Sequence, residues 1–483
     1  MRRAPESRRR GRARVLGVVG GVLVLVLGAM AALRVLDLGP FSSPDWHEQP
    51  PAADAPVRAV TPSSREPALD GDPRWITGIS ADGRTFVDQD GAPVLVRGDA
   101  PWSLLTDLRP PEAEEYLTAR SEQGFNAVLV SLVGAVANGA PSDDGTTVDG
   151  LRPFVGGDVL RWDDAYFDRA HEVLRRAGEL GITTLLYPVD SWTLEHEFAG
   201  VPPATCRAFG ARVARWAKDL PVLWMSGGDY SPSAATDACL GALRDGIRST
   251  GDGRPFSVQL WSAPSAADDQ RWKGEVDWNF VYTYGPTSLA VRAAYDTRPH
   301  RPALLGEANY EGENNTGGPT TTTETLRRQV LWAITSGSPG EVFGTDDWEF
   351  LPGWQTRLRS EGATQVSRIR DVIASLRWWT LAPSDGFLTD GVGSAIDGQD
   401  VLGADLATAS VAPDGSLALV YVPSGRAVSL DLSRVDPAAS AVWVDPSTGT
   451  AMPVPLTREL RTPGANAAGA GDWLLVVGTD LPF

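Results

Sequence analysis

Short apolar runs alternate with amphipathic helical stretches between residues 94 and 378, and this alternation limits the possible folds more than any other feature of the chain. Apolar strands separated by helices are typical of a parallel sheet that is buried on both faces. Eight such runs predict a (β/α)8 TIM barrel. The alternative is a doubly wound open sheet, but no Gly-rich phosphate-binding turn follows the first run. The apolar runs lie at residues 94–96, 127–132, 182–189, 222–226, 256–260, 280–284, 303–306 and 341–343.

Helical periodicity disappears after residue 382, and the composition changes to short strands separated by turn residues. We expect strands at 416–422, 427–430, 441–444 and 473–477. This pattern predicts a small all-β sandwich domain over residues 383–483. The (β/α)8 catalytic domain is then expected over residues 75–382.

The N-terminus has the pattern of a targeting segment. An Arg-rich tail over residues 1–14 precedes the uncharged apolar run 15–33, which is long enough to cross a bilayer as a signal-anchor helix. Basic residues stay on the cytoplasmic side, so we expect a cell-membrane protein with its body outside the cytoplasm. A cleaved signal peptide, ending near Ala29-Met30-Ala31, is the alternative and would make the protein secreted. Residues 34–74 are rich in Pro, Ala, Ser and Asp and predict a flexible linker.

Charge and cysteine content exclude several classes of function. The net charge is −18 although eight Arg lie within residues 1–34, so the body is strongly acidic and would repel nucleic acids. With two Cys and four His, the chain lacks ligands for a structural zinc site, and we expect no metal or redox cofactor. Outside the cytoplasm, Cys206 and Cys239 are expected to form a disulfide; two buried free thiols are the alternative.

Carboxylates follow several of the predicted strands, where a TIM barrel carries its active site. Asp229 follows the fourth run and Glu307 the seventh. We expect these two side chains to approach one bond from two directions. Glycosidic cleavage requires such a pair, because one carboxyl must be protonated and the other ionised. The alternative for an Asp at a strand end is to cap the following helix.

Aromatic and acidic residues in the same loops are candidates for binding sugar. The apolar face of a sugar ring stacks on aromatic side chains, and its hydroxyls bind carboxylates. For each aromatic residue the alternative is ordinary packing. The predicted substrate-binding residues are Asp99, Trp102, Asp190, Trp192, Tyr284, Tyr310, Glu311 and Trp348.

Several motifs along the chain resemble those of the apiosidase-like glycoside hydrolases, a (β/α)8 family. The β-domain that follows this barrel in the family, labelled as collagen-binding, is also similar to residues 423–426, 443–449 and 471–473. In the barrel the resemblance is carried by Gly98-Asp99-Ala100-Pro101-Trp102, Gly124-Phe125-Asn126, the W-x-x-GGD segment ending at Asp229, the E-x-x-YEG segment from Glu307 to Gly312, and residues 337–348.

The resemblance implies a retaining, exo-acting glycosidase that removes a terminal sugar from a poly- or oligosaccharide. It implies that Asp229 is the acid/base and Glu307 the nucleophile, which predicts carboxyl groups about 5–5.5 Å apart. Glu341, Phe343 and Thr345 depart from the family pattern; we expect them to line the sugar pocket, so that an arabinofuranoside is as plausible a substrate as an apioside. A catalytically inactive cell-envelope carbohydrate-binding or adhesion protein is the alternative function.

Overall fold

The computed structural model describes residues 59–60, 73–261, 265–314, 319–394 and 400–483. The predicted tail 1–14, the predicted membrane span 15–33 and most of the predicted linker lie outside these residues. Within the described ranges, no helix combines the length and the apolar character that crossing a bilayer requires.

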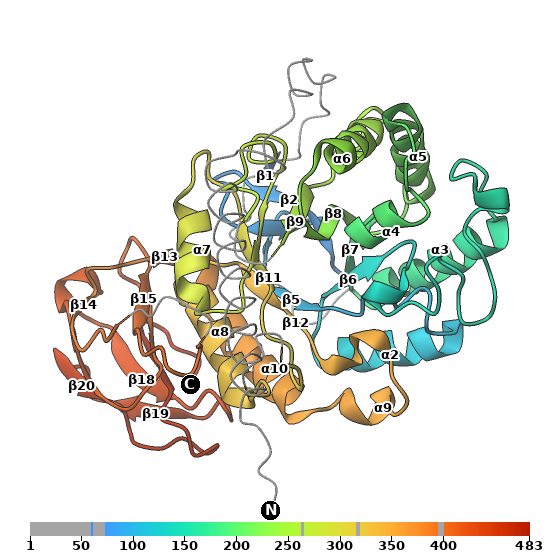
Figure 1. Ribbon diagram of the computed structural model, residues 1–483. Helices are drawn as coiled ribbons and strands as arrows, with labels where there is room; N and C mark the ends of the chain where they lie inside the picture. The colour runs from blue at the N-terminus through green and yellow to red at the C-terminus, as the bar shows by residue number, and fades with distance from the viewer. Residues whose placement is uncertain (1–58, 61–72, 262–264, 315–318, 395–399) are drawn as a thin grey trace, which may run out of the picture.

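Eight parallel strands form the expected barrel, seen on the right of Figure 1. Seven neighbouring pairs are joined by parallel ladders in the order β10-β11-β12-β5-β6-β7-β8-β9. The ring is nearly closed between β9 and β10, where the Ser257 hydroxyl donates a hydrogen bond to the Trp278 carbonyl. The strands are β5 (Val96–Asp99), β6 (Ala127–Ser131), β7 (Thr183–Tyr187), β8 (Val222–Tyr230), β9 (Phe256–Leu260), β10 (Asn279–Tyr282), β11 (Ala303–Glu307) and β12 (Gly340–Phe343).

The helices surround this barrel and lie between the strands in the chain, as the alternating pattern predicts. Two short helices that the sequence did not indicate, α4 and α9, follow β7 and β12. The helices are α2 (Pro110–Glu122), α3 (Asp164–Glu179), α4 (Ser191–Glu195), α5 (Pro203–Trp216), α6 (Ala234–Arg248), α7 (Thr287–Asp296), α8 (Thr323–Thr335), α9 (Trp354–Arg357) and α10 (Glu361–Ala374).

A small sheet covers the N-terminal end of the barrel. It consists of β1 (Ala59–Val60), β2 (Ile76–Ser80), β3 (Phe86–Asp88) and β4 (Pro93–Val94), and β3 and β4 form a hairpin. Ile76 and Phe86 belong to the same apolar cluster as inward-facing side chains of the barrel strands. Since this end is filled, a substrate site is expected at the opposite, C-terminal ends of the strands, which we call the barrel mouth.

The C-terminal region forms two separate β sheets whose apolar side chains share one cluster. The larger sheet has the order β13-β15-β16-β21-β18-β19, and the smaller has the order β14-β17-β20. These strands are β13 (Ala382–Pro383), β14 (Leu388–Asp390), β15 (Thr408–Val411), β16 (Leu417–Val422), β17 (Ala427–Leu430), β18 (Ser440–Val444), β19 (Ala451–Val454), β20 (Glu459–Arg461) and β21 (Trp473–Gly478).

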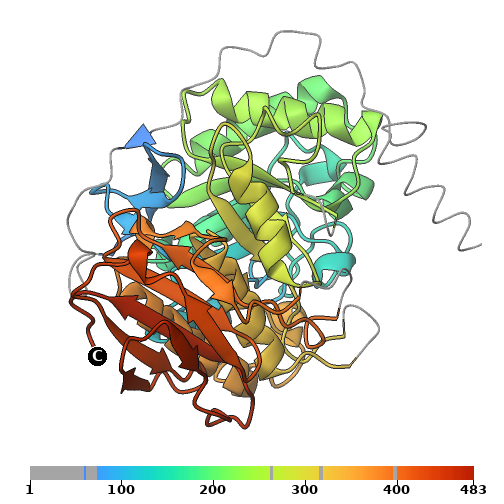
Figure 2. The ribbon, with the colours of Figure 1, turned by 90° about the vertical axis from the view of Figure 1, so that its left-hand side faces the viewer.

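The larger sheet packs against α8 and α10 of the barrel, and Figures 1 and 2 both show the C-terminal region on that side of the barrel. Every residue of α8 from Thr325 to Thr335 is buried, because the helix is covered by the barrel on one side and by the sheets on the other. Within this domain interface, Arg327 of α8 donates two hydrogen bonds to Asp472, with both side chains fully buried. The sheets are therefore an integral part of the folded body.

The predicted disulfide between Cys206 and Cys239 is confirmed, and it joins α5 to α6. The two helices approach closely through glycines: a Cβ at Gly210 would lie 2.1 Å from the Leu243 carbonyl oxygen. The two cysteines are 33 residues apart in the sequence, and a disulfide that closes a loop of that length contributes about 2–4 kcal/mol to stability.

Candidate active site

Asp229 lies on an irregular extension of β8. Gly227, Gly228 and Asp229 have φ angles of +86°, +83° and +47°, and the β8–β9 register shifts between Gly227 and Tyr230. A Cβ at Gly227 would lie 2.2 Å from the Gln259 carbonyl oxygen, so only Gly fits there. Residues 227–229 thus form a β-bulge. This bulge explains why β8 is longer than predicted, and it moves Asp229 out of the ladder at the barrel mouth.

Glu307 is the last residue of β11 and is 7% exposed. The Gln259 side chain donates a 2.7 Å hydrogen bond to Oε2 of Glu307, and the Tyr284 hydroxyl lies 3.4 Å from Oε1. Tyr187 in turn donates to Oε1 of Gln259 at 2.6 Å, which leaves the Gln259 amide nitrogen facing Glu307. Neutral donors from β9 and from the loop after β10 thus hold the Glu307 carboxyl, and Tyr187 of β7 orients the donor from β9.

Tyr282 connects the two acidic residues. It lies at the end of β10, and β9 and β10 are the two strands between β8 and β11 on one side of the ring. Burial raises the pKa of both Asp229 and Glu307, and the polar hydroxyl of Tyr282 opposes this rise at both carboxyls. The same hydroxyl lies 2.6 Å from that of Tyr284. Asp229 and Glu307 therefore share a neighbour at the barrel mouth, while their separation of 5–5.5 Å stays a prediction.

The two carboxyls also influence each other. Burial and the negative charge of Asp229 raise the pKa of Glu307 well above its ordinary value, and burial raises the pKa of Asp229. Oδ1 of Asp229 is buried and accepts no hydrogen bond from the residues that the structure describes. Since two neighbouring carboxylates resist simultaneous ionisation, the pair favours a state with one proton and one negative charge.

This pair differs from most other buried carboxyls of the molecule. Among the residues that the structure describes, neither Asp229 nor Glu307 forms an ion pair with a cation. Two further buried carboxyls, Asp190 and Asp445, accept hydrogen bonds from neutral donors only. The Arg-paired ones are Asp88 with Arg74, Asp99 with Arg120, Asp237 with Arg271, Glu341 with Arg370, Asp347 with Arg357 and Asp472 with Arg327.

Three predicted site residues lie against the bulge. The Gly228 position faces Asp190, Trp192 and Trp102: a Cβ there would lie 3.3–3.5 Å from side-chain atoms of each. Asp190 caps α4 by accepting from the Thr193 amide, which is the capping role that the sequence left open. Trp102 is buried, and its ring centroid lies 5.5 Å from that of Trp192. Its contacts are therefore mainly with other side chains, and little of its ring is open to a sugar.

Three further predicted residues also lie at the barrel mouth. Tyr284 contacts Glu307, as described above. Tyr310 is buried, and its hydroxyl accepts a hydrogen bond from the Trp102 indole at 3.3 Å. The indole of Trp348 donates to Glu313, whose negative charge also raises the pKa of Tyr284. Glu313 is thus a third acidic residue near the pair, and no sequence pattern singled it out.

Two predicted residues are engaged elsewhere. The Asp99 carboxylate accepts from Arg120 and the Tyr116 hydroxyl on α2. Glu311 accepts from the Gly362 amide at 2.9 Å and the Ser360 hydroxyl, at the N-terminus of α10. The structure does not bring these two carboxylates together with Asp229 and Glu307.

The expectation that Glu341 and Phe343 line the sugar pocket is wrong. Glu341 pairs with Arg370 of α10, and Phe343 packs at 6.0 Å from Phe125. Alternate residues of a strand face opposite sides, and here Val342 is the one that faces the barrel interior. Thr345 caps a 3-10 turn through the Asp347 amide.

Sequence reasoning missed Tyr282, Gln259 and Tyr187. They lie within or at the end of apolar strands, where polar atoms interrupt the apolar pattern. Their polar atoms could have identified them from the sequence, since a polar residue in a strand buried on both faces needs a hydrogen-bond partner inside the barrel.

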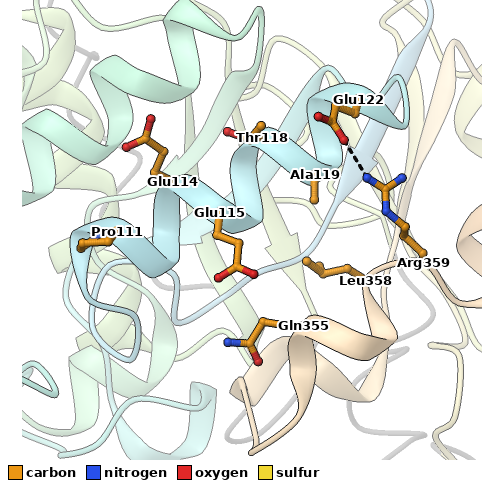
Figure 3. Close-up of a pocket in the computed structure, with 9 residues that line it drawn as sticks. All are labelled: Pro111, Glu114, Glu115, Thr118, Ala119, Glu122, Gln355, Leu358 and Arg359. Atoms are coloured by element: carbon orange, nitrogen blue, oxygen red, sulfur yellow. Dashed lines mark hydrogen bonds and ion pairs between the residues drawn. The ribbon is translucent and has the colours of Figure 1, made fainter.

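A surface cavity of about 450 Å³ lies on the outer face of α2 and is shown in Figure 3. An ion pair of 2.6 Å joins Glu122 and Arg359 at its edge. No predicted site residue lines it; the lining residues are Pro111, Glu114, Glu115, Thr118, Ala119, Glu122, Gln355, Leu358 and Arg359.

Comparison with known families and structures agrees with this architecture. The family model described as "Apiosidase-like, catalytic domain" matches residues 80–380. A glycoside hydrolase family 5 structure from Bacteroides vulgatus is 21% identical, with a TM-score of 0.72 over 83% of this chain and 93% of that chain. A second structure, described as a glycoside hydrolase, is 18% identical, with a TM-score of 0.74 over 88% and 99%. At such identities the likeness concerns the fold alone. A comparison with curated proteins found no match.

Proposed function

This chain belongs to the apiosidase-like family and is a glycosidase that hydrolyses O-glycosyl bonds, and from that premise we propose that it removes a terminal sugar with retention, using Asp229 as acid/base and Glu307 as nucleophile. One observation carries the proposal. Among the residues that the structure describes, Glu307 is a buried carboxyl that no cation pairs with, and burial and a second carboxyl, Asp229, both raise its pKa. Such pairs cluster at catalytic sites, because they are unfavourable for stability.

The assignment of roles follows from the donors around each carboxyl. Gln259 and Tyr284 donate hydrogen bonds to Glu307, and these donors favour its ionised form against the burial and the Asp229 charge that raise its pKa. Asp229 is half-buried at the barrel mouth whereas Glu307 is buried, so Asp229 is the more accessible of the two carboxyls to a leaving oxygen.

The reaction then has two steps. In the first step, a Glu307 oxygen bonds to the anomeric carbon, the bond to the leaving oxygen breaks, and that oxygen takes the proton of Asp229. In the second step, water attacks the anomeric carbon and gives a proton to Asp229, while the bond to Glu307 breaks. The two displacements together retain the anomeric configuration.

For the substrate we propose a terminal pentofuranose, apiose or arabinofuranose, on a poly- or oligosaccharide. The family match supports this class of sugar. Trp192, which is partly buried, and Tyr284 offer aromatic surface beside the two carboxyls.

We also propose that the body, divided into a catalytic domain over 75–382 and a β-domain over 383–483, is held outside the cytoplasm by the apolar segment 15–33. The Cys206–Cys239 disulfide supports this location, because disulfides persist in oxidising compartments. Protease added to intact cells should digest the body of the full chain. A body that is cleaved only after lysis would contradict the proposed location.

Substitution of each carboxyl tests the proposed reaction. Aryl and alkyl apiosides and arabinofuranosides, together with polysaccharides containing these sugars, are screened with the wild-type chain. Asp229→Asn should slow alkyl glycosides by about 10²–10⁴-fold and activated aryl glycosides much less, since only poor leaving groups need the proton. Glu307→Gln should lose activity on both. Equal losses with both leaving groups in Asp229→Asn would contradict the role of Asp229.

A further inference from the structure

The loop after β7 contacts the bulge that carries Asp229 at three consecutive positions. Asp190 forms a parallel bridge with Gly227. The Ser191 hydroxyl donates a hydrogen bond to the Gly228 carbonyl oxygen. The Trp192 ring lies so close to Gly228 that an added Cβ would be 3.3 Å from it. Residues 190–192 thus form one wall of the segment 227–229.

The bulge needs such support because its own backbone conformation is unfavourable. Asp229 has a φ of +47°, in the left-handed region that residues with a Cβ seldom adopt. Gly228 and Asp229 also fall in the stretch where the β8–β9 register shifts, so the ladder does not hold them. Local strain of this kind persists only where the surroundings impose it.

The Ser191 bond acts on the peptide unit that sets the direction of Asp229. The Gly228 carbonyl and the Asp229 amide belong to one planar peptide, so a hydrogen bond to that oxygen restrains the plane from which Asp229 extends. Without this bond, the Asp229 carboxyl would sample other directions, and proton delivery depends on geometry within tenths of an ångström.

Ser191 is itself held in place by a buried polar network. The Asp190 carboxylate is fully buried and accepts hydrogen bonds from Asn138 at 2.8 Å, from the Thr193 amide at 2.7 Å, from the Thr193 hydroxyl at 2.6 Å and from the Ser131 hydroxyl. These bonds fix the end of β7 and the start of α4, where Ser191 is the first residue.

We infer that Ser191 is a positioning residue for the acid/base, acting through the Gly228–Asp229 peptide, and that the Asp190 network keeps its hydroxyl in place. This inference rests on the proposed function, because it gives Ser191 a role only if Asp229 transfers a proton. It predicts a defect specific to substrates that need that proton.

The test compares Ser191→Ala with Ser191→Thr, which keeps a hydroxyl, on alkyl and dinitrophenyl glycosides of the same sugar. Ser191→Ala should lower kcat on the alkyl glycoside about 10–100-fold and on the dinitrophenyl glycoside less than about threefold. Ser191→Thr should restore most of the alkyl rate. The basic limb of the pH–rate profile should also move in Ser191→Ala, since it reports the protonation of Asp229.

Ser233→Ala is the matched control. Ser233 follows the segment 227–229 in the chain and caps α6 by accepting a hydrogen bond from the Thr236 amide, so its loss should lower Tm and leave the ratio of alkyl to dinitrophenyl rates unchanged. An unchanged ratio and pH profile in Ser191→Ala, beside a changed ratio in Asp229→Asn, would overturn the inference alone. An unchanged ratio in Asp229→Asn would overturn the proposed role of Asp229 itself.

Discussion

The barrel mouth and the domain interface both bury carboxyl groups, but they surround them differently. At the domain interface, Asp472 faces the guanidinium of Arg327, and both are fully buried. At the barrel mouth, Glu307 faces neutral donors and a second carboxyl, Asp229. At the domain interface the positive charge of Arg327 balances the buried negative charge. At the barrel mouth no cation of the described residues does so, and a bound substrate can interact with the carboxyls instead. The comparison therefore separates carboxyls that serve the fold from carboxyls that are available for chemistry.

The largest effect is expected when a compensated pair is broken. Arg327→Met leaves Asp472 buried without its cation, which should lower the free energy of unfolding by about 3–5 kcal/mol. Urea denaturation measures this change. Arg292→Met is the control, because Arg292 pairs with Asp385 at 2.8 Å near the same interface but with 32% and 84% of the side chains exposed. It should cost less than about 1 kcal/mol. Equal losses of unfolding free energy in the two variants would mean that burial does not determine how much each ion pair contributes to stability.

Replacing each of two buried glutamates on neighbouring strands with glutamine should change the stability of the protein in opposite directions. Glu341→Gln leaves the buried Arg370 guanidinium without its anion and should destabilise by about 2–4 kcal/mol. Glu307→Gln strands no charge and removes the repulsion by Asp229, so it should stabilise at pH 8, raising Tm by roughly 2–4 °C. Thermal unfolding of both variants shows whether Tm rises or falls relative to the wild type. A destabilised Glu307→Gln would mean that Glu307 serves the fold.

The pH dependence of this effect has a definite sign. A carboxyl whose pKa is raised by folding contributes stability that is complete below its unfolded pKa of about 4.3 and is lost as pH rises through the folded pKa. The advantage of Glu307→Gln over the wild type should therefore be present at pH 8 and vanish near pH 4. Tm measured across this range at constant ionic strength gives the profile. A difference that does not change with pH would contradict the raised pKa of Glu307.

A smaller shift is expected in the titration of the pair. The negative charge of Asp229 raises the pKa of Glu307, so Asp229→Asn should lower the pKa of Glu307. The measurement follows the side-chain carboxyl carbon of Glu307 by 13C NMR as the pH is raised. A Glu307 pKa that does not change would mean that the two carboxyls do not interact.

Most of the fold could be predicted from the sequence because its signals are local. Apolar runs such as 256–260 stand out from the amphipathic helices around them, and β9 has the predicted bounds. Asp229 and Glu307 were found for a related reason: in a parallel barrel, the end of a strand identifies the face on which its next residues lie.

The rest depends on which side of a strand each residue faces, and this is set by register and tertiary contacts. Asp99 ends a strand as Glu307 does, yet it pairs with Arg120 in the helix layer. The shift at Gly227 and Gly228 is invisible to a period-two pattern. Tyr282 became recognisable only when the ring placed β10 between the strands of the two carboxyls.

Trapping the covalent intermediate tests the central claim most directly. The wild-type chain and Glu307→Gln are incubated with a 2-deoxy-2-fluoro dinitrophenyl glycoside of the sugar found in the screen, digested, and mapped by mass spectrometry. We predict a fluoroglycosyl mass increment on the peptide that contains Glu307, and none in Glu307→Gln. A label on another residue, or an unlabelled enzyme whose first product is inverted, would contradict the account.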